Sequence, residues 1–208
     1  MQVPFFHIRK TSILILAMLF SFNGHAQENW RLKKDRNGVK IYSRDYPNSK
    51  FKEYKAIMVV KTSLQEVKAI VLDADNLKNW NYKTSKSKLV KKIDENKFIF
   101  YLFNDMPWPV LNRDHVSDVA VTYPNDKSIR INISPNNDIL PENKGTVRIT
   151  NFKGFWLLEE TSKGISITHQ LFGDPEGGVP AWLVNSQLVK SPYTSFNNLK
   201  DLLENKDD

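Results

Sequence analysis

Two histidines are the residues of this chain whose side chains are best suited to chemistry. The sequence holds four histidines, and His115 and His169 are the two that lie beyond the first 26 residues. An imidazole titrates near neutral pH and can act as a general acid, a general base or a metal ligand. The two stand far apart in the sequence, and a lone histidine is more often structural than catalytic. They therefore predict no active site by themselves.

The sequence lacks the other common catalytic patterns. It has no cysteine, so no thiol nucleophile is available, and it contains neither a Gly-x-Ser-x-Gly elbow nor a His-Glu-x-x-His zinc pattern. Asp73 and Asp75 could bind a cation, but an acidic helix end is the simpler interpretation. We predict no catalytic residue, no metal site and no cofactor. A paired acid–base site assembled from residues distant in the sequence stays open.

The first residues have the pattern of a secretory signal. Arg9 and Lys10 precede an apolar run, Ile13 to Phe22, and small residues follow before Gln27. This order predicts cleavage after Ala26 and export to the periplasm or the exterior. The run is shorter than the roughly 20 apolar residues that span a bilayer, although an uncleaved anchor is the alternative. We expect residues 1–26 to be a signal peptide and residues 27–208 to form one domain.

The basic charge of the chain gives little evidence of a nucleic-acid partner. Lysine and arginine number 30 against 23 acidic residues, which gives a formal charge of +7. Most basic residues are interleaved with acids, and only Lys83 to Lys92 forms a local basic stretch. A solvated surface is the simpler interpretation, and transient contact with an anionic membrane surface is the alternative. The export signal and the lack of a nucleic-acid motif argue against DNA or RNA, and we expect a monomer.

Most of the chain after the signal is predicted to be β-structure. The dipeptide Asn37-Gly38 marks a hairpin, and Ser63 with Glu66 forms a capping box that begins a helix running to about Leu72. A short helix or structured loop follows over residues 73–82. The expected strands are 30–34, 39–44, 51–61, 87–93, 98–103, 115–122, 128–134, 146–160 and 165–172.

The last segment, Gly173 to Leu203, opens with a turn at Pro175, Gly177 and Gly178, and a long amphipathic helix is predicted from about Pro180 onward. Trp182, Val189, Tyr193, Phe196, Leu199 and Leu203 recur at spacings of three, four and seven, which places them on one apolar stripe. Pro192 interrupts the pattern, so either the helix kinks there or a second helix begins. The kinked helix is the better interpretation because the stripe keeps its phase across the proline.

An antiparallel sheet with one dry face needs a cover, and the terminal helix is the one predicted element long enough to supply it. We therefore expect an α+β fold in which a curved sheet and the helix enclose an apolar cavity, where a ligand could lie. The same residues could equally fill a core. The candidate ligand-binding residues are Phe100, Ile131, Trp156, Trp182, Val189, Tyr193 and Phe196.

Three segments carry a resemblance to a known family. They are Met106 to Asp114 (MPWPVLNRD), Asn151 to Trp156 (NFKGFW) and Gly173 to Asn185 (GDPEGGVPAWLVN), together with Pro192-Tyr193. In this order they resemble the START (steroidogenic acute regulatory protein-related lipid-transfer) domain family, and particularly its bacterial members.

The resemblance implies a helix-grip fold with a ligand tunnel and a protein that binds one lipid, sterol or other apolar molecule without a cofactor. It implies structural or gating roles for Trp108, Arg113, Asp114 and Pro192. Some sterol-binding members carry a buried acid–arginine pair, but Val119 stands where the arginine would be, which argues against a sterol held by that pair. The expected function is to bind, and to transfer or sense, one apolar ligand. An enzyme of this fold and a non-binding adaptor are the alternatives.

Overall fold

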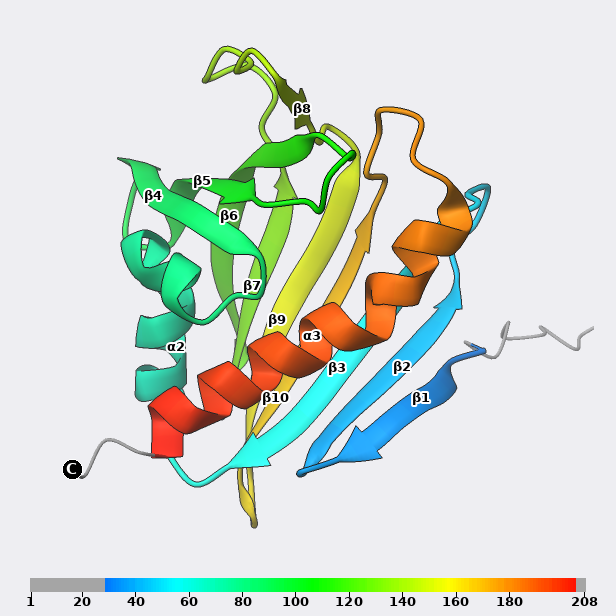
Figure 1. Ribbon diagram of the computed structural model, residues 1–208. Helices are drawn as coiled ribbons and strands as arrows, with labels where there is room; N and C mark the ends of the chain where they lie inside the picture. Colours follow the sequence, from blue (N-terminus) through cyan, green and yellow to red (C-terminus); the bar gives the residue numbers. More distant parts are fainter. Residues whose placement is uncertain (1–28, 205–208) are drawn as a thin grey trace, which may run out of the picture.

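The computed structural model describes residues 29–204, and within them one large sheet and a long C-terminal helix dominate (Figure 1). The predicted signal segment lies outside the described residues. The strands are β1 (Arg31–Arg36), β2 (Val39–Asp45), β3 (Lys52–Val60), β4 (Thr84–Lys92), β5 (Lys97–Asn104), β6 (Asn112–Asn125), β7 (Ser128–Pro135), β8 (Thr146–Arg148), β9 (Phe152–Thr161) and β10 (Gly164–Gly173). The helices are α2 (Leu64–Leu72), the 3-10 helix η2 (Ala74–Asn79) and α3 (Ala181–Glu204).

The sheet is antiparallel along its main path and has the order β1-β2-β3-β10-β9-β7-β6-β5-β4. Its inner face is apolar because side chains alternate along each strand. In β10, for example, Ile165 and Ile167 are buried, whereas Ser166 and Thr168 are less so. Register shifts between paired strands, as between Leu89 and Lys91, accompany the bending of the sheet (Figure 1). The predicted α+β, helix-grip architecture is confirmed.

The predicted strand 146–160 is wrong in one respect, because the structure divides it. β8 pairs with β6 in parallel, and β9 begins at Phe152 and pairs with β7 and β10. Between them Thr150 leaves the ladder, and its backbone N–H donates to the Glu176 carboxylate at 3.0 Å. A partner distant in the sequence therefore causes the interruption, which local propensity could not reveal.

The helix that the capping box predicts is confirmed. Ser63 Oγ accepts from the backbone N–H of Glu66, and the Glu66 side chain accepts from the backbone N–H of Ser63. The helix buries Leu64, Val67 and Val71. The expected short helix after it is η2.

The long terminal helix is also confirmed, and α3 continues through Pro192 as one helix. Its buried stripe agrees with the prediction at Phe196, Leu199 and Leu203 but differs from it at Trp182. The buried residues are Pro192, Ser195, Phe196, Leu199 and Leu203, whereas Trp182 is 73% exposed. Apolar residues are adjacent at 182–184 and 188–189, so spacing alone left the phase of the first half open.

The three helices cover only part of the inner face. α3 crosses in front of the sheet in Figure 1 and packs against β2 and β3, while α2 packs against β7 and β9 and η2 packs against β4. β5 and β7 have only limited contact with a helix, through η2 and α2 respectively, and β6 has less. This incomplete cover leaves room for a pocket.

The basic stretch 83–92 consists of Lys83 and the lysines of β4, which is an edge strand of the sheet. Its lysines are exposed, and lysines on an edge strand oppose pairing with another chain. Across residues 29–204, none of the helices has both the length and the apolar character to cross a bilayer.

Two aromatic residues of α3 should differ sharply in their contribution to stability. Phe196 is fully buried, so we expect Phe196→Ala to lower the free energy of unfolding by about 3–5 kcal/mol. Trp182→Ala removes an exposed ring and should change it by less than about 0.5 kcal/mol. Urea denaturation followed by circular dichroism measures both. Equal losses would show that the helix packs in a different phase.

Candidate functional site

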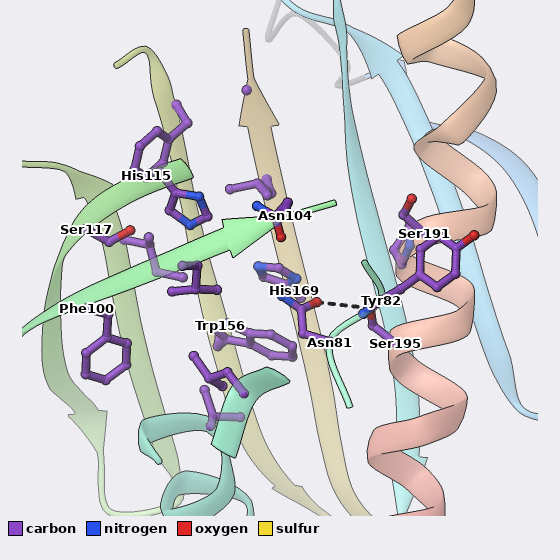
Figure 2. Close-up of a pocket in the computed structure, with 18 of the residues that line it drawn as sticks. Asn81, Tyr82, Phe100, Asn104, His115, Ser117, Trp156, His169, Ser191 and Ser195 are labelled. Carbon is purple, nitrogen blue, oxygen red and sulfur yellow. Dashed lines mark hydrogen bonds between the residues drawn. The ribbon is translucent and has the colours of Figure 1, made fainter. Parts of the chain in front are cut away.

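A pocket of about 290 Å³ lies between the inner face of the sheet, the segment after η2 and the middle of α3 (Figure 2). Most of its wall is apolar or aromatic. The sheet supplies Tyr54, Phe100, Leu102, Asn104, His115, Ser117, Val119, Ile131, Ile133, Phe152, Trp156, His169, Leu171 and Gly173. The remaining lining residues are Val71, Leu77, Trp80, Asn81, Tyr82, Ile149, Ser191, Pro192 and Ser195.

An aromatic cluster around Trp156 forms one side of this pocket. The Trp156 ring stacks on His169 with centroids 3.9 Å apart and on Phe196 of α3 at 5.7 Å. Trp80 meets Trp156 edge to face at 6.0 Å. Because these rings join the sheet, α3 and the segment after η2, the cluster fixes the distance between the pocket walls.

Two neutral imidazoles line the pocket, and Figure 2 shows both among the surrounding side chains. His169 Nδ1 lies 3.0 Å from the Tyr54 hydroxyl. Burial lowers the pKa of His169 to about 3. Burial also lowers the pKa of His115 to about 4, although the charge of Asp114 partly opposes this change. Both histidines are therefore uncharged at neutral pH.

A polar network borders the pocket where α3 meets the segment after η2. Ser195 Oγ accepts from the Tyr82 backbone N–H at 2.9 Å and donates to Asn81 Oδ1 at 3.1 Å. Asn198 Nδ2 donates to the Trp80 carbonyl at 3.0 Å. These bonds hold α3 against the segment 80–82 beside the pocket.

The structure brings some of the predicted ligand-binding residues into the pocket and not others. Phe100, Ile131 and Trp156 line it. Phe196 is buried behind Trp156, and Tyr193 packs at the edge of the core with its ring under the Lys34 ammonium group. Val189 and Trp182 are not among the lining residues. Of the four residues predicted to be structural or gating, Pro192 alone contributes to the wall.

Arg113 joins two loops at one end of the molecule. Its guanidinium donates to the carbonyls of Leu111, Pro175 and Glu176, and burial lowers its pKa. Gly177 lies beside it with a φ of +63°, and an added Cβ would lie 3.2 Å from Arg113 Nη2. The loop 105–111 and the entry to α3 are thus held together, while Trp108 on that loop is 92% exposed.

Asp114 forms a buried ion pair with Arg148 on the side of β6 opposite Arg113. Its oxygens accept from Arg148 at 2.8 and 3.2 Å and from Asn143 at 2.7 Å. Burial alone would raise the pKa of Asp114, but the hydrogen bonds from Arg148 and Asn143 outweigh it and hold the pKa below its usual range. Val119 lines the pocket. An apolar side chain therefore stands at the position where the resemblance to sterol-binding members would place the arginine of a buried acid–arginine pair.

Sequence reasoning missed His115, Ser117, His169 and Tyr54 as pocket residues. The signal was present in the strand alternation, because His115 and Ser117 occupy the same face of β6 as Val119 and Val121. Likewise, His169 continues the series of Ile165 and Ile167 along β10. In the sequence these polar residues interrupt an apolar series, yet inward-facing polar residues are the ones that can orient a ligand.

Comparison with known proteins accounts for this architecture. The family model of the START domain matches residues 16–205. The chain belongs to the START domain family. The solved structure of a STAR-related lipid transfer protein fragment from Xanthomonas axonopodis matches with a TM-score of 0.78 and 32% identity, covering 84% of this chain and 98% of that chain.

Two sequence relatives extend the comparison of this START domain. An uncharacterized protein from Pseudomonas aeruginosa is 29% identical over 195 residues, covering 93% of this chain and 96% of the relative. The phosphatidylcholine transfer protein of Rattus norvegicus is 26% identical over 185 residues, covering 85% of this chain and 83% of the relative. Both matches span most of each protein, so they concern the whole domain.

The two neutral histidines predict a loss of stability in mild acid. Their folded-state pKa values of about 4 and 3 lie below the value of about 6.5 in an unfolded chain. Below pH 6.5 the unfolded state therefore binds protons that the folded state does not. Stability is full above pH 6.5 and falls as the pH drops toward 4, with a limiting slope of about 1.4 kcal/mol per pH unit for each histidine.

Urea unfolding between pH 7.5 and 5, above the range in which most carboxylates titrate, measures this slope. The variant His115→Phe should lose the contribution of one histidine and show a shallower dependence. An unchanged slope in that variant would mean that His115 is solvated in the folded protein.

Proposed function

We propose that this START domain binds one lipid or other apolar molecule in the pocket beside α3 and transfers it between membranes. The observation that carries the proposal is the pocket itself, with apolar and aromatic side chains around most of its wall. Membership of the START domain family and the two lipid transfer relatives support lipid binding and transfer in general. The bound molecule would be shielded from water while it crosses from one membrane to another.

Apolar burial suffices to explain useful affinity. Each buried methylene contributes about 0.8 kcal/mol, so a ten-carbon chain gains on the order of 8 kcal/mol. Ordering of the ligand and the loss of its free motion offset several kcal/mol of this gain. The remaining free energy corresponds to a carrier that can both take up and release its ligand.

The pocket is better suited to holding a molecule than to transforming it. Among the described residues, no group of three or more His, Cys, Asp or Glu side chains could hold a metal ion. The lining contains no carboxylate, and imidazoles with pKa values of about 4 and 3 are weak bases. Efficient general acid–base catalysis at neutral pH needs a pKa closer to 7. These features favour a carrier over an enzyme of the same fold.

Native mass spectrometry of the protein purified without detergent tests the proposal. We expect one intact apolar molecule per chain, released when the protein is denatured. A chemically altered molecule would favour an enzyme, and protein that remains empty after incubation with lipid vesicles would favour an adaptor. The mass of the chain in the same spectrum shows whether residues 1–26 have been removed.

Transfer also requires the pocket to open, and we propose that α3 moves away from the segment 80–82. Three hydrogen bonds hold it there: two at Ser195 and one at Asn198. At about 1 kcal/mol net for each bond, breaking all three costs on the order of 3 kcal/mol. Pro192 lies beside them and cannot donate a helical hydrogen bond to the Leu188 carbonyl, which makes this part of α3 the natural place for movement.

A disulfide between positions 82 and 195 should stop transfer. Ser195 Oγ lies 2.9 Å from the Tyr82 backbone nitrogen, so the two residues are in direct contact, and the natural sequence has no cysteine that could compete for the pairing. We expect oxidised Tyr82→Cys/Ser195→Cys protein to transfer fluorescent lipids between vesicles at least tenfold more slowly than the same protein after reduction. The reduced form is the matched control. Equal rates before and after reduction would show that α3 need not move.

A further inference from the structure

The lining of the pocket contains polar groups but no charge. Among the described residues, none that lines the pocket is an aspartate, glutamate, lysine or arginine. A phosphate, carboxylate or ammonium group inside it would lose its hydration and gain no ionic partner, which is strongly unfavourable. Aromatic faces can stabilise an ammonium group, but they offer nothing to a phosphate beside it. The part of a ligand that enters the pocket is therefore uncharged.

Several polar side chains in the same wall have no hydrogen-bond partner among residues 29–204. Ser117 Oγ and His169 Nε2 are buried without a hydrogen bond. The side chain of His115 is half-buried and makes no hydrogen bond to another described residue, and its ring meets Phe152 edge to face at 5.2 Å between centroids. Buried polar groups are nearly always hydrogen-bonded in native proteins. A concentration of unpaired ones at a pocket points to a ligand that completes them.

Two of these residues are neighbours on one strand. His115 and Ser117 are separated by one residue on β6, so both side chains face the pocket, about 7 Å apart along the strand. The neutral imidazole of His115 offers one N–H donor and one bare nitrogen acceptor. Because no side-chain hydrogen bond from residues 29–204 fixes its tautomer, His115 can donate or accept. A hydroxyl group matches this pair because it too does both.

On the basis of the carrier function proposed above, we propose that the pocket selects an uncharged amphiphile with a hydroxyl group, and that His115 and Ser117 bind this hydroxyl. The size of the pocket is consistent with a small ligand of this kind. At about 290 Å³ the pocket lies just below the roughly 300–1,000 Å³ typical of ligand pockets. It fits one acyl chain or a compact ring system better than the two chains and charged head group of a phospholipid.

Matched ligands test this proposal directly. The probes are 1-dodecanol, 1-fluorododecane, dodecanoate and dipalmitoyl phosphatidylcholine, and binding is followed by the fluorescence of Trp80 and Trp156 in the pocket wall. Fluorine is a far poorer hydrogen-bonding group than a hydroxyl of similar size. We expect the wild-type protein to bind 1-dodecanol about tenfold more tightly than 1-fluorododecane, and more tightly than either charged lipid.

The ratio of the dodecanol to the fluorododecane affinity distinguishes a hydrogen bond from packing. In His115→Phe and Ser117→Ala this ratio should fall several-fold while fluorododecane binds as before, because the apolar contacts are kept. Ser128 provides the control: its hydroxyl is also buried without a partner, but it lies outside the pocket, so Ser128→Ala should keep the wild-type ratio.

Two results would overturn the proposal and leave the carrier function standing: a ratio unchanged in both pocket variants, or phosphatidylcholine bound at least as tightly as 1-dodecanol. Protein that binds none of the four probes and purifies empty would contradict the carrier function as well. Ser117→Ala keeps the test decisive if His115→Phe does not fold, because it removes only one oxygen atom.

Discussion

The architecture depends on a mismatch between the width of the sheet and the width of the helix that covers it. Nine strands stand in hydrogen-bonded order, and at about 4.8 Å between neighbours they extend about 38 Å. A single helix is only about 10 Å wide, so α3 covers little more than β2 and β3. α2 and η2 cover another part. An apolar surface remains between them, and the fold leaves it as the wall of a pocket.

Bulky aromatic rings keep this space from collapsing. Trp156 stands between His169 on one strand and Phe196 on α3, with Trp80 at its edge. Aromatic pairs of this kind contribute roughly 0.5–1.5 kcal/mol beyond the burial of their area, and their rigid planes set a minimum distance between helix and sheet. The helix can therefore not settle onto β6. The cluster stabilises the fold and holds the pocket open at the same time.

The sequence correctly predicted the elements that are determined by residues close together in the chain. The Asn37-Gly38 turn and the Ser63–Glu66 capping box each act within a few residues, and both appear as expected. The sequence did not predict features that depend on a contact with a residue far away in the chain. The contact of Thr150 with Glu176 divides a predicted strand. The face of α3 that becomes buried depends on where Trp156 and the segment 80–82 lie, so local spacing placed Trp182 on the apolar stripe although its ring is exposed.

In the candidate site, too, some residues could be predicted from the local sequence and others could not. Phe100, Ile131 and Trp156 were predictable because an inward apolar residue on a strand either lines a cavity or fills a core. His115 and His169 were not, because whether an imidazole faces water, a carboxylate or an apolar wall depends on the neighbouring strands. Their lowered pKa values arise from burial, a property that no stretch of sequence carries by itself.

The absence of charge from the lining rests on the register of β6. Alternate residues of this strand face the pocket, from His115 through Ser117 to Val119, while Asp114 faces the other way. A slip of one residue would exchange the two faces and turn carboxylates toward the apolar wall. The buried pair of Asp114 with Arg148, which Asn143 and Tyr101 complete, opposes such a slip because it would leave an isolated charge out of water. An ion pair outside the pocket thus specifies which side chains a ligand can meet inside it.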